Sequence, residues 1–319
     1  MTDQPPAPDR HVHTEWSWDA AAGDMLATCA RALELGLPGV AFTEHADFTS
    51  WITERAASGG APPVPAGSVK DSAGSAKDSW DWAAGRLPGR RWPVRVTANS
   101  GQIGELDIAG YWGALDRCRS EFPGLRIESG VELGEPHLFP EQVARLLGHR
   151  PLDRLLGSQH AIEVEGELVD MSVPGLLSPE QADRRFRLYM AATLELVESP
   201  APFTILAHVD YAKRFWPHRD VRFDERDFEE EYRSVFRALA RGGRALEVNS
   251  SRAMGPPRGP CPGPLPLRWW HEAGGAAISF GSDAHRPEEL AAGLGDAAAM
   301  AEAAGFHPAD DPLQLWVRD

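Results

Sequence analysis

The chain has 319 residues, 42 % of them apolar, and a formal net charge of −15. This length suffices for one large barrel domain or two ordinary domains with a sizeable core. The acidic balance disfavours nucleic-acid binding, which needs a basic surface. It does not exclude a small phosphorylated substrate, since bound metals reverse the local field. No apolar run approaches the ~20 residues that span a bilayer, so we expect no membrane partner.

The N-terminus and the cysteines bear on the compartment. Residues 1–10 are polar and proline-rich and lack the apolar core of a signal peptide, which predicts a cytoplasmic protein. The three cysteines form no CxxC pair, which argues against a disulfide framework and a zinc knuckle. Cys29 and Cys118 fall on apolar helix faces and are interpreted as core residues, whereas Cys261 lies in a Pro/Gly-rich loop. The oligomeric state is not indicated.

Short apolar runs alternate with amphipathic helices along the chain. The predicted strands are 10–13, 39–43, 125–131, 155–158, 203–207, 245–248 and 277–281. The predicted helices are 24–35, 105–121, 178–197 (with a capping box at its start), 228–239 and 287–304. Alternating strands and helices imply a parallel sheet. About seven such units without a Rossmann glycine fingerprint favour a β/α barrel over an open sheet.

One segment, residues 50–101, does not fit this alternation. It is rich in Gly, Ala, Pro, Ser and Trp and shows no sustained period. Such a length is unusual for an ordinary barrel loop. We interpret the chain as one domain over residues 1–319 that carries this irregular insertion. The segment is either a solvated surface insertion or a lid anchored by its tryptophans, and the sequence leaves both open.

Histidines and carboxylates recur just after the predicted strands. The motifs are His11-Val12-His13, Glu44-His45, Glu132, His160, His208 and Asp283-Ala284-His285. Alternate residues of a strand share a face, so His-x-His points two ligands to one side. A barrel gathers the ends of its parallel strands at one mouth. We therefore predict a cluster of divalent metals at the carboxyl ends of the strands, a type of site that usually performs hydrolysis.

The motifs resemble, in order, those of the polymerase-and-histidinol-phosphatase (PHP) superfamily. The segments that resemble its histidinol-phosphatase branch most are Gly157-Ser158-Gln159-His160, Ala207-His208-Val209-Asp210-Tyr211 and Leu246-Glu247-Val248-Asn249-Ser250-Ser251. The resemblance covers nearly the whole chain except the insertion. It implies a distorted barrel of seven β/α units around a trinuclear metal site. It also implies hydrolysis of a phosphate monoester, with L-histidinol phosphate of histidine biosynthesis as the favoured substrate.

The resemblance implies a ligand set, motif by motif. The ligands form a first group (His11, His13, Glu132 and Asp283), a second that shares Glu132 (with His160 and His208) and a third (Asp19, His45 and His285). The branch often has histidine where this chain has Asp19, and a carboxylate shifts preference toward manganese, iron or magnesium relative to zinc. We expect two or three divalent ions, Mn, Fe or Zn. Glu44 is expected to orient a ligand histidine.

Further residues are candidates for catalysis and substrate binding. Asp210 or Asp283 is expected to relay a proton, and the sequence does not choose between them. Arg214 and Arg252 begin loops on the metal side, and the resemblance supports both as phosphate-binding residues. A guanidinium also pairs well with the phosphate oxygens that metals leave free. Asn249 either lines the mouth or caps the end of its strand.

Other functions stay in view as alternatives. A phosphoesterase of the same superfamily acting on another phosphorylated metabolite or a nucleotide is the main one, and a non-catalytic metal-binding PHP domain is another. A barrel amidohydrolase would carry a lysine that bridges its metals, but no lysine ends a predicted strand, and Lys213 lies beyond the His208 motif. The acidic charge disfavours a polymerase-associated exonuclease.

Overall fold

The computed structural model describes residues 7–48, 106–251 and 258–318. A single curled sheet dominates it, with the strand order β1-β2-β3-β4-β7-β8-β9-β11-β10. The strands are β1 (Asp9–Val12), β2 (Gly39–Ala46), β3 (Arg126–Gly134), β4 (Arg154–Ser158), β7 (Ile205–Leu206), β8 (Ala245–Asn249), β9 (Ala277–Gly281), β10 (Phe306–His307) and β11 (Trp316–Arg318). Each predicted strand is present. The predicted insertion at residues 50–101 and Arg252 lie outside the described residues.

Strands β1 to β9 of this sheet run parallel, and β11 pairs antiparallel with β9 and β10. The sheet curls until its first strand meets the end of β9. The backbone amide of Asp283 donates to the carbonyl of His11, and that of His13 to Ala284, both at 2.8 Å. This contact brings the first histidine motif beside the last one, although they lie at opposite ends of the chain.

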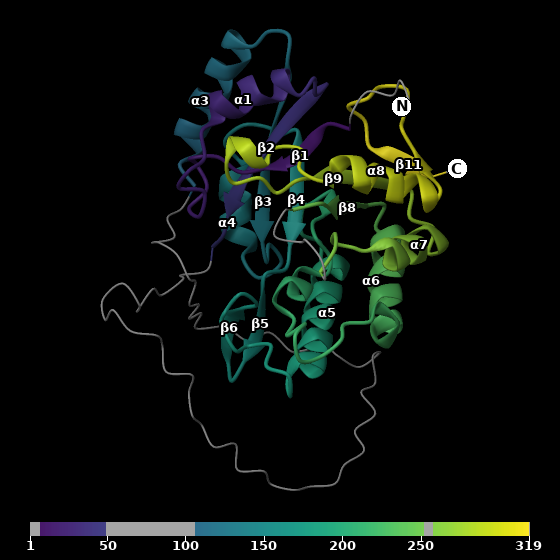
Figure 1. The fold of residues 1–319 in the computed structure, drawn as a ribbon. Helices are drawn as coiled ribbons and strands as arrows, with labels where there is room; N and C mark the ends of the chain where they lie inside the picture. Colours follow the sequence, from purple (N-terminus) through teal and green to yellow (C-terminus); the bar gives the residue numbers. More distant parts are fainter. Residues whose placement is uncertain (1–6, 49–105, 252–257, 319) are drawn as a thin grey trace, which may run out of the picture.

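Helices cover the outside of the curled sheet (Figure 1). They are α1 (Met25–Glu34), α3 (Ile108–Glu121), α4 (Pro140–Leu147), α5 (Ala182–Glu198), α6 (Glu229–Arg241), α7 (Pro264–Glu272) and α8 (Leu294–Ala303). The apolar faces of α1 and α3 pack with β2 in one core cluster, which includes Cys29 and Cys118 as predicted. Helices α5, α6 and α7 enclose a larger core around Phe186, Tyr232 and Trp270. Burial of each such side chain stabilises the folded state by on the order of 1.5–3 kcal/mol.

The capping-box prediction at the start of α5 is wrong by one turn. The helix begins at Ala182, and its N-cap residue Gln181 makes no side-chain capping bond. The carbonyl of Ser178 instead accepts from the amides of Gln181 and Ala182, which forms a separate turn. Ser178 and Pro179 correctly indicate that a helical segment begins nearby, but a separate turn precedes the regular helix α5.

The alanine-rich helix predicted over 287–304 is interrupted. A short 3-10 turn, η4 (Pro287–Glu289), is followed by left-handed backbone at Ala291 (φ 59°) and Gly293 (φ 77°), and α8 starts only afterwards. The carboxylate of Asp9 accepts from the Ala291 amide at 2.8 Å, and Ser250 donates to the Ala292 carbonyl. These contacts with distant segments hold a break that helix propensity alone does not predict.

A hairpin outside the main sheet follows β4. Its strands β5 (Ala161–Val164) and β6 (Glu167–Asp170) lie at the end toward which β3 and β4 point (Figure 1). The short turns η1 (Tyr211–Phe215) and η2 (Glu225–Phe228) follow β7. Among the described residues, no helix is both long and apolar enough to cross a bilayer.

Candidate functional site

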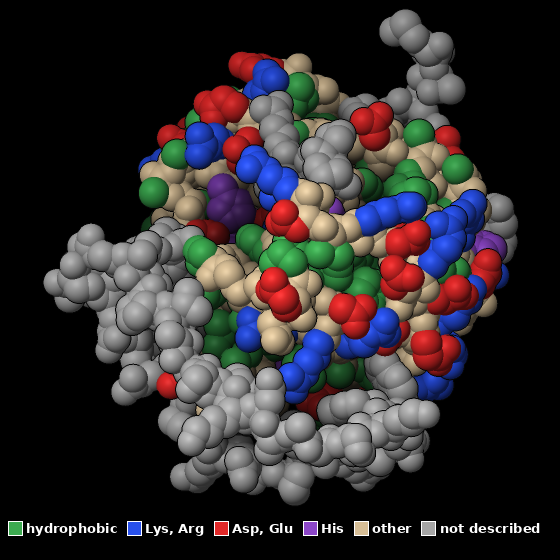
Figure 2. All heavy atoms as spheres, turned by 60° about the horizontal axis from the view of Figure 1, so that its bottom comes forward, with side chains coloured by type: hydrophobic (Ala, Val, Ile, Leu, Met, Phe, Trp, Pro, Cys, Tyr) green, Lys and Arg blue, Asp and Glu red, His purple; other side chains and the backbone are tan. Residues whose placement is uncertain are grey.

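A pocket of about 190 Å³ opens at the carboxyl ends of the parallel strands. Its lining residues are Trp18, Asp19, His45, Asp47, Glu132, His160, Asp170, Ser172, His208, Tyr211, Arg214, Asp283 and His285. Figure 2 looks onto this end and shows recessed histidine and acidic side chains. On the surrounding described surface, acidic and basic side chains are interspersed (Figure 2).

The Glu132 carboxylate is the centre of the site. Its two oxygens lie 2.7–3.3 Å from one ring nitrogen of each of five histidines, His11, His13, His45, His160 and His208. Strand β3 carries Glu132, and the five histidines come from β1, β2 and the segments after β1, β4 and β7. The curled sheet thus directs side chains from distant parts of the sequence at one carboxylate.

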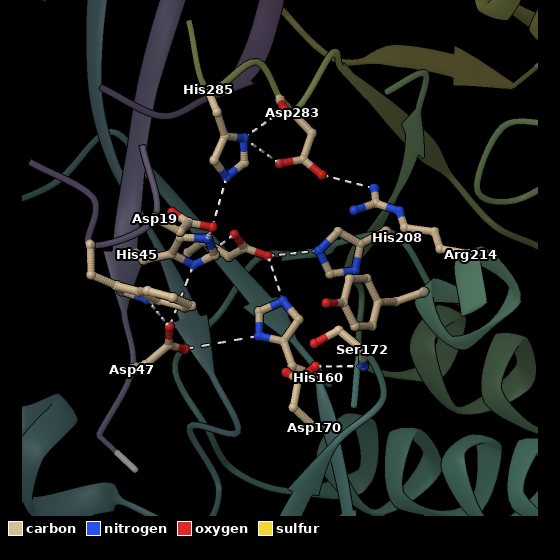
Figure 3. A pocket seen from close by; sticks show the side chains of 13 residues that line it. Asp19, His45, Asp47, His160, Asp170, Ser172, His208, Arg214, Asp283 and His285 are labelled. Carbon is tan, nitrogen blue, oxygen red and sulfur yellow. Dashed lines mark hydrogen bonds and ion pairs between the residues drawn. The ribbon is translucent and has the colours of Figure 1, made fainter. Parts of the chain in front are cut away.

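Two further carboxylates extend the cluster (Figure 3). Asp19 lies 2.9 Å from His285 Nε2 and 3.4 Å from His45 Nε2. One oxygen of Asp283 lies 3.3 Å from His13 Nε2 and 3.7 Å from His285 Nδ1. All nine side chains predicted as ligands therefore meet in one place, and this includes Asp19.

Seven of the nine predicted ligands form three sets whose ligand atoms lie within 4.8 Å of one another. The sets are His13 with His45 and His285, His11 with Glu132 and His208, and His11 with His13 and Asp283. They overlap with the grouping implied by the family resemblance but do not reproduce it. His13, for example, also joins the set of His45 and His285. Nitrogen and oxygen atoms converging at this spacing fit divalent metal ions.

The electrostatics of the cluster favour bound cations. Burial opposes ionisation of Glu132, but the histidines around it outweigh burial and hold the pKa of this carboxyl well below its usual range. Asp283 behaves alike, with Arg214 as the main stabilising charge, and its pKa is also held well below the usual range. In the other direction, burial lowers the pKa of His160, but Glu132 raises it to about 9. Ionised carboxylates thus draw positive charge to the ring nitrogens, and a divalent cation supplies the same charge as those protons.

Two further carboxylates lie beside the histidines, and one of them, Glu247, fixes the orientation of the His11 ring. Glu247 Oε1 lies 2.6 Å from His11 Nδ1, and its other oxygen accepts from the His208 backbone amide at 2.9 Å. Asp47 accepts from the Trp18 indole at 2.8 Å and lies 3.6 Å from His45 Nδ1. Carboxylates that orient ligand histidines tune metal affinity. Our sequence interpretation did not assign either of these acids.

Sequence signals for both of these acids exist. Glu247 is the one charged residue of the apolar strand β8, where it lies between Leu246 and Val248. Asp47 follows His45 by two residues at the end of β2, where alternate residues share a face. The prediction that Glu44 orients a histidine is met only indirectly. Glu44 accepts from Ser17 Oγ at 2.5 Å, and that hydroxyl lies 3.0 Å from His13 Nδ1.

Backbone with positive φ occurs at three non-glycine residues that follow strands of the main sheet at this end. The φ angles are 43° for Glu135, 21° for His208 and 55° for Asp283. Such conformations in non-glycine residues cost on the order of 1–3 kcal/mol each and persist where surrounding contacts hold them. The Glu135 carboxylate accepts from the amides of His160 and Ala161, and burial raises its pKa to about 7. This acid therefore fixes the backbone at His160.

Arg214 lines the pocket, a location that the predicted phosphate-binding role requires. Its Nη2 donates to Asp283 Oδ2 at 2.8 Å and to Asn249 Oδ1 at 3.0 Å. Asn249 is fully buried and does not line the pocket, so it supports Arg214 and does not form part of the mouth. Of the two alternatives left open for Asn249, the structure favours a supporting role at the strand end.

The structure does not support Asp210 as a proton relay. Its side chain is fully buried outside the pocket lining, where it lies 2.8 Å from Lys213 Nζ and accepts from the Tyr232 hydroxyl at 2.8 Å. The residues after His208 enter the η1 turn, and this turn directs Asp210 toward α6. Asp283 is the predicted relay residue that does line the pocket.

Comparisons with known proteins agree with this site. A family model described as "PHP domain" matches residues 9–251. The "Histidinol-phosphatase" of Lactococcus lactis subsp. lactis is 24% identical over 203 residues, which cover 63% of this chain and 74% of that protein. A Clostridium acetobutylicum protein named "Probable histidinol-phosphatase" is 22% identical over 204 residues, 64% of this chain and 76% of that protein.

A solved structure is similar in fold. It is the histidinol phosphate phosphatase of Lactococcus lactis complexed with zinc, L-histidinol and phosphate, and it has a TM-score of 0.69 and 21% identity. The superposition covers 95% of each chain. Because the PHP model matches most of the residues and spans all but the last of the candidate ligand motifs, this chain belongs to the PHP domain family.

Proposed function

We propose that this protein is a metal-dependent phosphatase that hydrolyses L-histidinol phosphate to L-histidinol and phosphate. The observation that carries this proposal is the convergence of nine histidine and carboxylate side chains, seven of which line a single pocket beside one buried arginine, Arg214. Histidinol-phosphatase relatives support the substrate. We also infer that the curled sheet is a distorted barrel of seven β/α units, which would make residues 1–319 one domain.

The residues present fit a group of two or three divalent ions. Asp19 Oδ1 is buried and has no hydrogen-bond partner among the described residues, so an acceptor is available beside His45 and His285. We assign Asp19, His45 and His285 to one ion, with His11, His13 and Asp283 to a second and His160 and His208 to a third. Glu132 is shared between the last two. The ions supply charge that neutralises the phosphate oxygens and activates water.

The chain itself supplies orientation and proton handling. Arg214 holds its guanidinium against Asp283 and Asn249, which leaves its other donors for phosphate oxygens. Its Nε is buried without a hydrogen-bond partner in the described structure, consistent with a donor kept for a ligand. Asp283 lies between Arg214 and the histidines and is the acid placed to hold a proton from the attacking water or to return it to the leaving alkoxide.

Changing Arg214 to alanine is expected to lower kcat/KM for a phosphate monoester at least about tenfold, which corresponds to roughly 1.4 kcal/mol of transition-state stabilisation. Lysine should rescue only partly, because it keeps the charge and loses the paired donors. The control is Arg222→Ala, whose side chain is 84% exposed and pairs only with Asp224 in the described structure. Equal kcat/KM values for R214A and R222A would remove Arg214 from substrate binding.

A phosphate-release screen tests the proposed function as a whole. The screen contains L-histidinol phosphate, other phosphorylated metabolites and nucleotides, each with and without chelator. We expect L-histidinol phosphate to give the highest kcat/KM, and chelation to abolish turnover until manganese, iron or zinc is restored. Plasma mass spectrometry should find two or three metal equivalents per chain. Turnover that persists in metal-free protein would contradict the mechanism, and a preference for a nucleotide would contradict the substrate.

A further inference from the structure

Asp170 is a pocket residue to which neither the metal cluster nor the phosphate contact gives a role. It ends β6 in the hairpin after β4, where it pairs with Ala161, the residue next to His160. The residue is only 7% exposed, yet it lines the pocket together with Ser172. Figure 3 places Asp170 and Ser172 on the side of the pocket away from Asp283 and His285.

Asp170 forms no close ion pair in the described structure, unlike the other acids in the pocket, although the charge of His160 acts on its carboxyl and offsets part of the rise in pKa that burial causes. Asp19, Asp47, Glu132 and Asp283 each lie within 4.0 Å of a histidine or arginine nitrogen. Across the described parts of the chain, no lysine, arginine or histidine nitrogen lies within that distance of Asp170. One oxygen accepts from the Ser172 backbone amide at 2.7 Å, and hydrogen bonding by the Ser172 side chain also lowers the pKa of this carboxyl. A buried carboxylate without a cation is costly unless a ligand supplies one.

We propose that Asp170 binds the ammonium group of the substrate and so selects phosphate esters of amino alcohols. This inference rests on the proposed phosphatase function and adds the specificity determinant. A 2-amino alcohol phosphate carries a dianion at one end and an ammonium group two carbons from the ester oxygen. Arg214 and the metal cluster take the dianion, and Asp170 faces the opposite side of the pocket. The Ser172 hydroxyl adds a second polar contact for the same nitrogen.

An alternative role for Asp170 is structural, because its carboxylate caps the turn at Ser172. Asparagine distinguishes the two roles, since its amide oxygen keeps the cap and its charge is lost. A matched control exists elsewhere in the chain. Asp224 accepts in the same way from the backbone amide two residues ahead, Arg226, at 3.1 Å, and it lies outside the pocket lining. Asp170→Asn and Asp224→Asn therefore change the same kind of cap, and only the first removes a charge from the pocket.

The experiment measures kcat/KM of the metal-loaded enzyme for L-histidinol phosphate, phosphoethanolamine and p-nitrophenyl phosphate. The first two carry the ammonium group and the third does not. In D170N the ratio of kcat/KM for L-histidinol phosphate to that for p-nitrophenyl phosphate should fall at least about thirtyfold, mainly through KM, because a buried charge contact with the ligand is lost. The phosphoethanolamine ratio should fall as well. D224N should keep both ratios.

The outcomes separate this inference from the proposed function. If wild-type enzyme prefers another phosphate ester over L-histidinol phosphate, the proposed substrate fails, and the phosphoethanolamine ratio still tests Asp170. If D170N lowers kcat/KM equally for all three esters, or changes none of them, Asp170 is not the ammonium site. A fall for L-histidinol phosphate alone would assign Asp170 to the imidazole and overturn the proposal. Inhibition by the product L-histidinol, measured at equal thermal midpoints, should weaken in D170N by a similar factor.

Discussion

Replacing Glu132 with glutamine is expected to lower kcat by about a thousandfold or more and to reduce bound metal to below one equivalent per chain. The carboxylate lies within 3.3 Å of ring nitrogens from five histidines, so it is the common negative charge of the cluster. Glutamine keeps the shape and removes the charge, and the cations held around it then repel one another with less compensation. Plasma mass spectrometry and initial rates of phosphate release measure the two effects.

A second glutamate of the same strand provides the control. Glu128 also lies on β3, but it forms a bidentate pair with Arg154 away from the pocket. E128Q tests the effect of losing a largely buried charge from this strand without touching the cluster, and it should retain full metal content. If E128Q and E132Q lost metal equally, the loss would reflect weakened folding of β3 and not a bridging ligand. Full metal content in E132Q would contradict the prediction that the Glu132 carboxylate is needed to bind the metal ions.

The strands could be predicted from the sequence, and so could the location of the candidate metal ligands at the carboxyl ends of these strands. A run such as 277–281 is short and mostly apolar, with two glycines before it and Ser282-Asp283 after it, and the structure has β9 over the same residues. Since parallel strands all end at one edge, repeated strand-end histidines had to meet there. The site geometry therefore follows from a periodic pattern, which needs no knowledge of long-range contacts.

Residues whose role depends on contacts between distant segments were harder to predict from the sequence. Glu247 orients His11 across 236 positions of sequence, and nothing in the local pattern of β8 names that partner. Asp170 reaches the pocket because the hairpin after β4 folds back over it, and this hairpin was not predicted. The break before α8 is similar, because Asp9 fixes it from the other end of the chain. In each case a single tertiary contact overrides or completes the local signal.

Asp210 is the converse case, since its position close to His208 in the sequence suggested a function but its side chain lies outside the pocket lining. It follows His208 by two residues, and on a strand that spacing would place both side chains on one face. The chain has already left β7 at this point, and the turn directs Asp210 into the interior. There it meets Lys213, which is 1% exposed and also donates to the Pro260 carbonyl at 2.6 Å. The pair is therefore a structural contact between η1 and the segment that precedes α7.

Replacing Lys213 with methionine is accordingly expected to destabilise the protein by about 3–5 kcal/mol, since it leaves the Asp210 carboxylate buried among the described residues beside two neutral groups, the Tyr232 hydroxyl and the Cys261 thiol, and no cation. Urea unfolding at fixed metal concentration measures the change. The double variant Asp210→Asn/Lys213→Met removes both charges and should recover much of the loss. Arg237→Ala breaks an exposed pair with Glu230, 50% and 62% exposed, and should cost less than about 1 kcal/mol. A double variant no more stable than K213M would show that the lysine matters for its contact with Pro260 and not for the charge of Asp210.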